Sequence, residues 1–504
     1  MPTEQDSVTY DNVGYGVQGV PAASVARAWT LKAPSYMALA TQRAMPDGIT
    51  VDTTSDSLNS RMGLTTPTSA AVTDIILSYP QFVANNPEGD FGVTYSVTAA
   101  IEYPAGTFYP VYTAGGSRTL SVTPGRGVLS FQPCPVYIPA GTQFWVKTYA
   151  SWTTGNFQLS AKCASWVSGD GTQRGTGLSD DTLVAGTPTT TSTAGFGPSV
   201  FGRLSSPCAV IGVIGDSICQ TATEPGNSVT GWQFLQRAMR GSIPLINLGR
   251  NSDSMAFYLQ RYDGRSAILR DKVSHVVMAL GRNDCGVSSL ATMMANYQTI
   301  IGRYLTLGIP VFGNTITPYT TSTDGWITAD NQTIVTSGNR EVTRQSFNSW
   351  LRANWKSLGL TRLYDWATAV DPSDSGKWSF DSNGTGRSAQ GFPTITNGAV
   401  TSCVMGSYLL TNNSGGSAYT ASSIVPCTVL SYPGSLGGGA VITGNVNGSG
   451  LVTSYNVLNG GGDYSYPPMV SPNGSWTHDG IHPDPRGYDR IITGCDIKPE
   501  DFVL

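Results

Sequence analysis

Hydrophobic residues follow three different patterns along this chain of 504 residues. In the first third, short segments of alternating apolar and polar residues are separated by turn residues, as at 93–97, 119–122 and 143–147. Short alternating strands at regular spacing indicate a β-sandwich of the jelly-roll kind. We therefore predict an N-terminal β-rich domain with a leading arm over residues 1–167. A linker rich in Gly, Pro and Thr is predicted over residues 168–203.

A second pattern begins near residue 208, where wholly apolar runs alternate with segments of helical spacing. Such runs are typical of strands buried on both faces of a parallel sheet. They cover residues 209–214, 243–248, 275–280, 309–316 and 361–366. Apolar residues three and four apart predict helices over 290–305 and 341–358, and a further helix is predicted over 485–493. The alternation of strands and helices predicts an α/β domain with helices on both faces of its sheet.

The third pattern interrupts the second. From Ser388 to Gly462 the chain has no Asp, Glu, Lys or Arg, and Gly, Ser, Thr and Asn separate short apolar segments. We predict an inserted β-rich module over residues 375–471, so that residues 204–374 and 472–504 together build the α/β domain. A long glycine-rich loop is the alternative structure for this segment.

Charge and cysteine content narrow the range of partners. The chain has 29 Lys and Arg against 33 Asp and Glu, so its net charge is −4 and it lacks the excess of basic residues that binds a phosphate backbone. We therefore expect no nucleic-acid partner. No apolar run approaches the roughly 18 residues of a membrane helix, and we expect no membrane partner. The eight cysteines form no CxxC pair and no cluster with His, so we expect neither a metal nor a cofactor. The pairs Cys134/Cys163 and Cys403/Cys427 are open to disulfides or to free buried thiols.

Three of the predicted strands end in residues that suit acyl transfer. The first is followed by Asp216 and Ser217, the second by Gly249, and the third by Asn283. Ligands bind outside the carboxyl ends of parallel strands, so these turns are expected to converge if the strands are neighbours. Ser217 would attack a carbonyl carbon. The backbone N–H groups of Ser217 and Gly249 and the side-chain amide of Asn283 would donate to the developing oxyanion.

A serine nucleophile needs a base, and the chain has three histidines. His275 opens a predicted buried strand, whereas His478 and His482 flank Asp479 in one loop. The spacing of Asp479 and His482 allows one loop to supply the base and the carboxylate that orients its ring. We therefore predict Ser217, His482 and Asp479 as the catalytic residues and His478 as a loop residue.

Together these segments resemble the SGNH, or GDSL-like, hydrolases, which are named for Ser, Gly, Asn and His in four blocks. The four matching segments are, in chain order, Gly215-Asp216-Ser217-Ile218, Gly249, Gly281-Arg282-Asn283-Asp284 and Asp479-Gly480-Ile481-His482. The resemblance covers residues 208–371 and 475–504. It implies a flavodoxin-like three-layer α/β/α fold, ester hydrolysis that often removes acetyl groups from carbohydrates, and the residue roles given above. Ser252 is a departure, because the second block usually has another glycine there.

We predict a serine esterase that removes acyl groups, with acetyl as the expected group, from a polysaccharide or surface glycan. The composition suits an extracellular setting, yet the N-terminal residues lack the basic start and apolar segment of a Sec signal. A phage tail protein would reconcile the two, and residues 451–468 resemble a glycine-rich β-repeat of such proteins. Its partners would be the acylated glycan, other virion proteins or further copies in a homo-oligomer such as a trimer. A secreted bacterial esterase and a structural or glycan-binding virion protein with a vestigial hydrolase fold are the alternatives.

Overall fold

The chain divides into two units, Met1–Lys32 and Ala33–Leu504, and every described residue belongs to the second. The computed structural model describes residues 37–38, 50–153, 155–160, 169–189, 194–220, 234–382, 384–387, 389–405 and 416–504. The predicted leading arm and Cys163 lie outside these ranges, as does part of the predicted linker.

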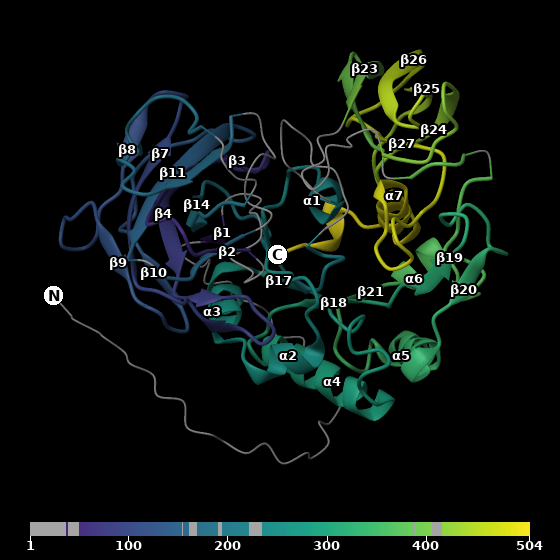
Figure 1. The fold of residues 1–504 in the computed structure, drawn as a ribbon, viewed down its shortest axis with the longest axis horizontal. Coiled ribbons are helices and arrows are strands. Elements are labelled where there is room, and N and C mark those ends of the chain that lie inside the picture. The colour runs from purple at the N-terminus through teal and green to yellow at the C-terminus, as the bar shows by residue number, and fades with distance from the viewer. Residues whose placement is uncertain are drawn as a thin grey trace. The chain divides into compact units, whose positions relative to one another are not determined.

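An antiparallel β-domain forms the first part of the described chain (Figure 1, purple to blue). One sheet has the strand order β1-β14-β4-β10, and a second has the order β13-β3-β11-β7-β8 with β9 beside β7. Two further pairs are β12-β2 and β5-β6. The two larger sheets contribute to one apolar core. The strands are β1 Met37–Ala38, β2 Thr50–Asp52, β3 Ser57–Thr65, β4 Val72–Pro80, β5 Phe82–Val83, β6 Gly89–Asp90, β7 Tyr95–Glu102, β8 Phe108–Pro110, β9 Leu120–Val122, β10 Val128–Ser130, β11 Gln143–Trp152, β12 Phe157–Leu159, β13 Gly171–Gly175 and β14 Ser199–Leu204.

The prediction of a linker over residues 168–203 is wrong for its two ends. β13 pairs with β3 in one sheet, and β14 pairs with β4 in the other. Both strands are short, neither shows the alternation of apolar and polar residues, and the stretches beside them are rich in Gly and Thr. The segment therefore helps to build the β-domain.

A five-stranded parallel sheet with the order β16-β15-β17-β18-β21 forms the centre of the second part. This is the 2-1-3-4-5 order of doubly wound sheets, in which ligands bind where the order reverses. The predicted strands are confirmed, although each is shorter than its predicted range and β15 ends one residue beyond it. The strands are β15 Ile211–Gly215, β16 Leu245–Asn247, β17 His275–Ala279, β18 Val311–Asn314 and β21 Arg362–Tyr364.

Helices bury one apolar core on each face of this sheet. Along β17, Val276 and Met278 belong to one core, whereas Val277 and Ala279 belong to the other, because successive strand residues point to opposite faces. The helices are α1 Phe234–Ala238, α2 Met255–Gln260, α3 Asp263–Lys272, α4 Leu290–Thr306, α5 Arg340–Asn354, α6 Trp366–Val370 and α7 Pro485–Gly494, with short 3₁₀ turns at Ser337–Asn339 and Pro499–Asp501. The predictions for α4 and α7 are confirmed, and α5 ends four residues before its predicted limit.

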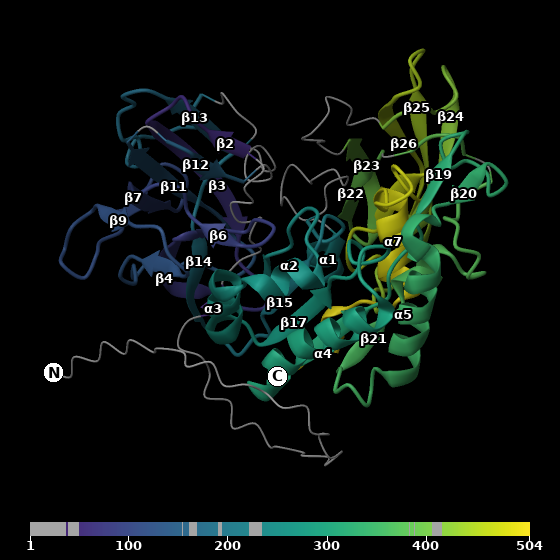
Figure 2. The same cartoon turned by 60° about the horizontal axis from the view of Figure 1, so that its bottom comes forward.

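The charge-free segment forms strands and not a long loop. Its sheet has the order β23-β22-β27-β24-β25-β26 and an apolar core of its own. In both views this sheet lies beside α7 (Figures 1 and 2). Its strands are β22 Gly391–Thr396, β23 Ala399–Met405, β24 Ile424–Leu430, β25 Gly438–Val446, β26 Val452–Gly462 and β27 Met469–Pro472.

A separate antiparallel pair is formed by β19 Thr320–Ser322 and β20 Gln332–Ile334, which lie between β18 and α5 in the chain.

Candidate active site

The turn after β15 carries Ser217. The strand ends at Gly215, where an added Cβ would come within 2.5 Å of the Cys219 Cβ, so the turn packs too closely for a larger residue. The carboxylate of Asp216 accepts a hydrogen bond from the Ile218 N–H (2.9 Å), and its carbonyl accepts one from the Gln220 N–H (2.9 Å). These bonds hold Ser217 at the carboxyl end of the central strand.

A second loop, residues 477–483, approaches the same end of the sheet. Gly480 has a φ of +83°, and an added Cβ would come within 1.9 Å of the Thr320 carbonyl oxygen. The indole N–H of Trp378 donates to the Gly480 carbonyl (2.9 Å), and the Thr477 hydroxyl donates to the His482 carbonyl (2.7 Å). Glycine is therefore required at position 480, and the loop is tied down on both sides of it.

The structure brings the predicted nucleophile, base and carboxylate together. His482 Nε2 lies 2.7 Å from Ser217 Oγ, and His482 Nδ1 lies 2.8 Å from Asp479 Oδ2. The other carboxylate oxygen of Asp479 accepts the backbone N–H groups of Ile481 and His482, each at 2.9 Å. Because the carboxylate is held by its own loop, the His482 ring is oriented with Nδ1 toward Asp479 and Nε2 toward the serine.

Two carboxyl groups near this chain of hydrogen bonds differ in their acidity. Burial opposes the ionisation of Asp479, but the hydrogen bonds and charge of His482 outweigh it and lower the pKa of Asp479 to about 2. Asp216 is fully enclosed, and burial raises its pKa to about 7 against the opposing effects of the Ile218 N–H, His482 and Arg282. Asp479 is therefore ionised at neutral pH, while Asp216 titrates near it.

The other two histidines have different surroundings. His275 begins β17 at the amino end of the sheet, and burial lowers its pKa to about 4. Burial also lowers the pKa of His478, whose backbone N–H donates to the His482 carbonyl (3.0 Å). His478 thus lies in the loop as predicted.

The three predicted oxyanion donors are engaged to different degrees. Among the described residues, no partner is found for the Ser217 backbone N–H. The Asn283 side-chain amide donates one N–H to the Asp253 carbonyl (2.8 Å), which leaves its second N–H for a ligand. The Gly249 N–H donates to the Asn247 side chain (2.9 Å), so it could reach an oxyanion only by giving up that bond.

Asp253 and Asp284 support this site by hydrogen bonds, Asp253 through its backbone carbonyl and Asp284 through its carboxylate. Asp253 was not identified from the sequence, since it acts on Asn283 through its backbone carbonyl, which every residue type has. Asp284 accepts the backbone N–H groups of Met255 (2.9 Å) and Ala256 (3.3 Å), and so binds the start of α2 to the turn after β17. The carboxylate has a structural use here.

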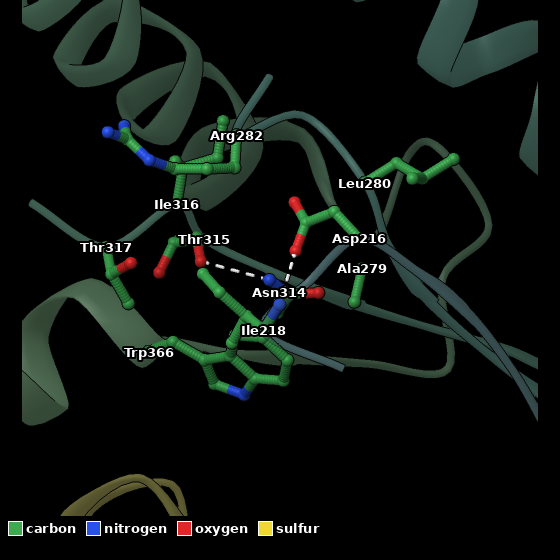
Figure 3. A pocket seen from close by; sticks show the side chains of 10 residues that line it. All are labelled: Asp216, Ile218, Ala279, Leu280, Arg282, Asn314, Thr315, Ile316, Thr317 and Trp366. Carbon is green, nitrogen blue, oxygen red and sulfur yellow. Dashed lines mark hydrogen bonds between the residues drawn. The ribbon is translucent and has the colours of Figure 1, made fainter. Parts of the chain in front are cut away.

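A small cavity opens beside the serine turn, at the carboxyl ends of β15, β17 and β18 (Figure 3). Its walls are mixed, with charged, hydroxyl and apolar side chains. They are Asp216, Ile218, Ala279, Leu280, Arg282, Asn314, Thr315, Ile316, Thr317 and Trp366. Burial lowers the pKa of Arg282 to about 10, so the guanidinium stays cationic at neutral pH, and it lies 4.4 Å from the centre of the Tyr319 ring.

The comparisons with known proteins concern only part of the chain. No protein-family model and no curated protein matches it. A solved protein assigned to the lipolytic G-D-S-L family of Desulfitobacterium hafniense is 21% identical over 32% of this chain and 79% of its own, with a TM-score of 0.25. A GDSL-like lipase of Bacteroides thetaiotaomicron is 13% identical over 34% of this chain and 75% of its own, with a TM-score of 0.24. A variant of an acetyl-xylooligosaccharide esterase of Geobacillus is 15% identical over 32% of this chain and 77% of its own, with a TM-score of 0.24.

The described residues contain no cluster of three or more His, Cys, Asp or Glu that could hold a metal ion. None of the helices in the described ranges combines the length and the apolar composition needed to cross a membrane.

Within those ranges Cys134, Cys403 and Cys427 are free thiols. Cys219 and Cys285, which follow the serine and asparagine turns, are free and buried as well.

Proposed function

We propose that this protein is a serine esterase of the SGNH type that hydrolyses acyl esters through Ser217, His482 and Asp479. The observation that carries the proposal is the continuous hydrogen-bonded chain from Ser217 Oγ to His482 Nε2 (2.7 Å) and from His482 Nδ1 to Asp479 (2.8 Å). A hydroxyl, an imidazole and a carboxylate in this order are the groups that nucleophilic acyl transfer requires.

The reaction would proceed through a covalent acyl-enzyme. Ser217 Oγ attacks the ester carbonyl carbon and passes its proton to His482 Nε2, while Asp479 stabilises the imidazolium. The negative charge on the former carbonyl oxygen is met by the Ser217 N–H and the second N–H of Asn283. Gly249 joins them once its N–H leaves the Asn247 side chain. The alcohol departs with the proton from His482, and a water molecule then repeats the sequence to release the acid.

An acetylated polysaccharide or surface glycan is the substrate class that we propose. The resemblance of the four sequence blocks to a family that often acts on such esters supports this class. The low charge of the chain and its glycine-rich insertion support an extracellular or virion-associated setting, with other virion proteins or copies of this chain as partners.

Hydrolysis of a chromogenic acetate ester tests the activity itself. We expect the wild type to hydrolyse it and Ser217→Ala to lose the activity by orders of magnitude. Ser357→Ala is a matched control, because Ser357 is an exposed serine just past the end of α5. Equal rates for the wild type and Ser217→Ala would exclude the esterase and leave a structural or glycan-binding protein. Acetate release from a panel of acetylated polysaccharides then identifies the substrate.

A further inference from the structure

One loop of the N-terminal β-domain, residues 82–90, is built into the α/β domain. Phe82 has no exposed surface and belongs to the apolar core on one face of the parallel sheet. It packs so closely on α3 that a Cβ added to Gly264 would come within 2.2 Å of its ring. The position of this loop relative to the α/β domain is therefore determined by core packing.

The same loop contacts the segment that follows Gly249. The Arg250 guanidinium donates to the Ala84 carbonyl and to the Asn85 side chain, each at 2.9 Å. In the opposite direction, the Asn86 amide donates to the carbonyl of Ser252 (2.9 Å) and to that of Asn251 (3.3 Å). Three successive residues of the N-terminal domain thus hold the backbone next to a predicted oxyanion donor.

The backbone conformation of Ser252 explains why this segment needs stabilising contacts from outside it. Its φ is +60°, in the left-handed region that favours glycine and costs energy for other residues. The hydrogen bond from Asn86 to the Ser252 carbonyl holds the peptide group that follows the strained residue. Here a contact from another domain supports a conformation that serine does not favour by itself.

A second route leads from the loop to Asn283. Glu88, Arg265 and Asp253 form an ion-paired row in which none of the three side chains is exposed. Arg265 donates to Glu88 at 3.1 Å and to Asp253 at 2.6 Å. The carbonyl of the same Asp253 accepts the Asn283 side-chain amide at 2.8 Å. The orientation of the Asn283 amide is thereby tied to a carboxylate of the N-terminal domain.

We propose that Asn86 and Glu88 of the N-terminal β-domain are positioning residues for the oxyanion site of the α/β domain. The inference rests on the proposed esterase function and deepens it. The segment that follows Gly249 is hydrogen-bonded to one loop of another domain, and Asn283 is connected to the same loop through Asp253 and Arg265. The N-terminal domain thus takes part in catalysis by holding the geometry of groups that it does not itself contribute.

The test compares Asn86→Ala with Asp90→Asn on the full chain, using the chromogenic acetate ester. Asp90 is a matched control, because it lies in the same loop and also pairs with the α/β domain, yet its partner is Arg261 and its side chain is 56% exposed. We expect kcat of Asn86→Ala to fall about tenfold with KM within about twofold, as displacement of donors without loss of binding predicts. For Asp90→Asn we expect kcat within about twofold of the wild type.

Replacement of the strained serine provides a rescue that a general loss of structure would not show. Glycine tolerates the left-handed conformation, so we expect Ser252→Gly to restore most of kcat in the Asn86→Ala background. Glu88→Gln tests the second route, since glutamine retains an acceptor for the Gly264 N–H that Glu88 now binds at 2.7 Å. We expect it to lower kcat while the thermal midpoint shows a folded protein.

The outcomes separate this inference from the proposed function. A wild type without esterase activity would remove the proposed function. An active wild type with an unchanged kcat in both Asn86→Ala and Glu88→Gln would overturn the positioning role alone. An equal loss of kcat in Asp90→Asn would also overturn it, because domain docking in general would then be responsible.

Discussion

Replacing Asp479 by asparagine should invert the donor and acceptor pattern of the catalytic imidazole. One oxygen of Asp479 accepts two backbone N–H groups, and the other accepts His482 Nδ1. In Asp479→Asn the amide oxygen must remain on the side of the two backbone donors, since an NH₂ group there would face two N–H groups. The NH₂ group therefore faces Nδ1, and the imidazole must carry its proton on Nε2.

A proton on Nε2 prevents this atom from accepting the Ser217 proton. The same substitution in a serine protease triad, which produces the wrong tautomer, lowers kcat by about 10⁴-fold. That factor corresponds to about 5 kcal/mol of activation free energy. Ser217 Oγ and His482 Nε2 lie 2.7 Å apart, so the variant loses the proton acceptor of an existing contact. We therefore expect kcat to fall by a factor of this order with little change in KM.

Two measurements check this reasoning. Ester hydrolysis gives kcat, and long-range ¹H–¹⁵N NMR of the three histidines gives the tautomer of His482. The wild type should carry the proton on Nδ1 and the variant on Nε2. Asp479→Ala is the control, because it removes the carboxylate without imposing either tautomer, and it should retain more activity than Asp479→Asn. A variant that keeps more than about a tenth of kcat, or keeps its proton on Nδ1, would refute the assigned geometry.

Two further predictions concern the neighbouring groups. Asn283→Ala should lower kcat by about 10²-fold or more, as loss of an oxyanion donor does, and a loss of under about threefold in the acetate assay would contradict that role. Asp216→Asn should stabilise the protein at pH 8 but hardly at pH 4. Burial raises the Asp216 pKa to about 7, so ionisation costs the wild type up to about 4 kcal/mol as pH rises from 4 to 8. Urea unfolding of both proteins across this range measures the difference, and parallel stability curves would contradict it.

Local patterns were sufficient for the five parallel strands and for the helices α4, α5 and α7. The apolar runs predicted the five parallel strands because a strand buried on both faces needs apolar residues at consecutive positions. The spacing of Met293, Tyr297, Ile300 and Tyr304 predicted α4, and all four are buried in the core that α4 covers. The strands β13 and β14 were missed because they lie in a Gly- and Thr-rich segment whose composition is typical of a linker, and only their pairing with β3 and β4 shows that they belong to the sheets.

Residue types and their local spacing identify the groups that are available for chemistry at this site. Ser217, Asn283, Asp479 and His482 have side chains whose type limits what they can do, and their places after strands or in one short loop are local properties. How these side chains are held depends on contacts that form when distant segments pack together. The carbonyl of Asp253, the bond from Gly249 to Asn247 and the contact from Asn86 to Ser252, 166 residues away, involve backbone groups or distant partners. Backbone groups are the same in every residue, so their contacts leave no trace in the amino-acid sequence.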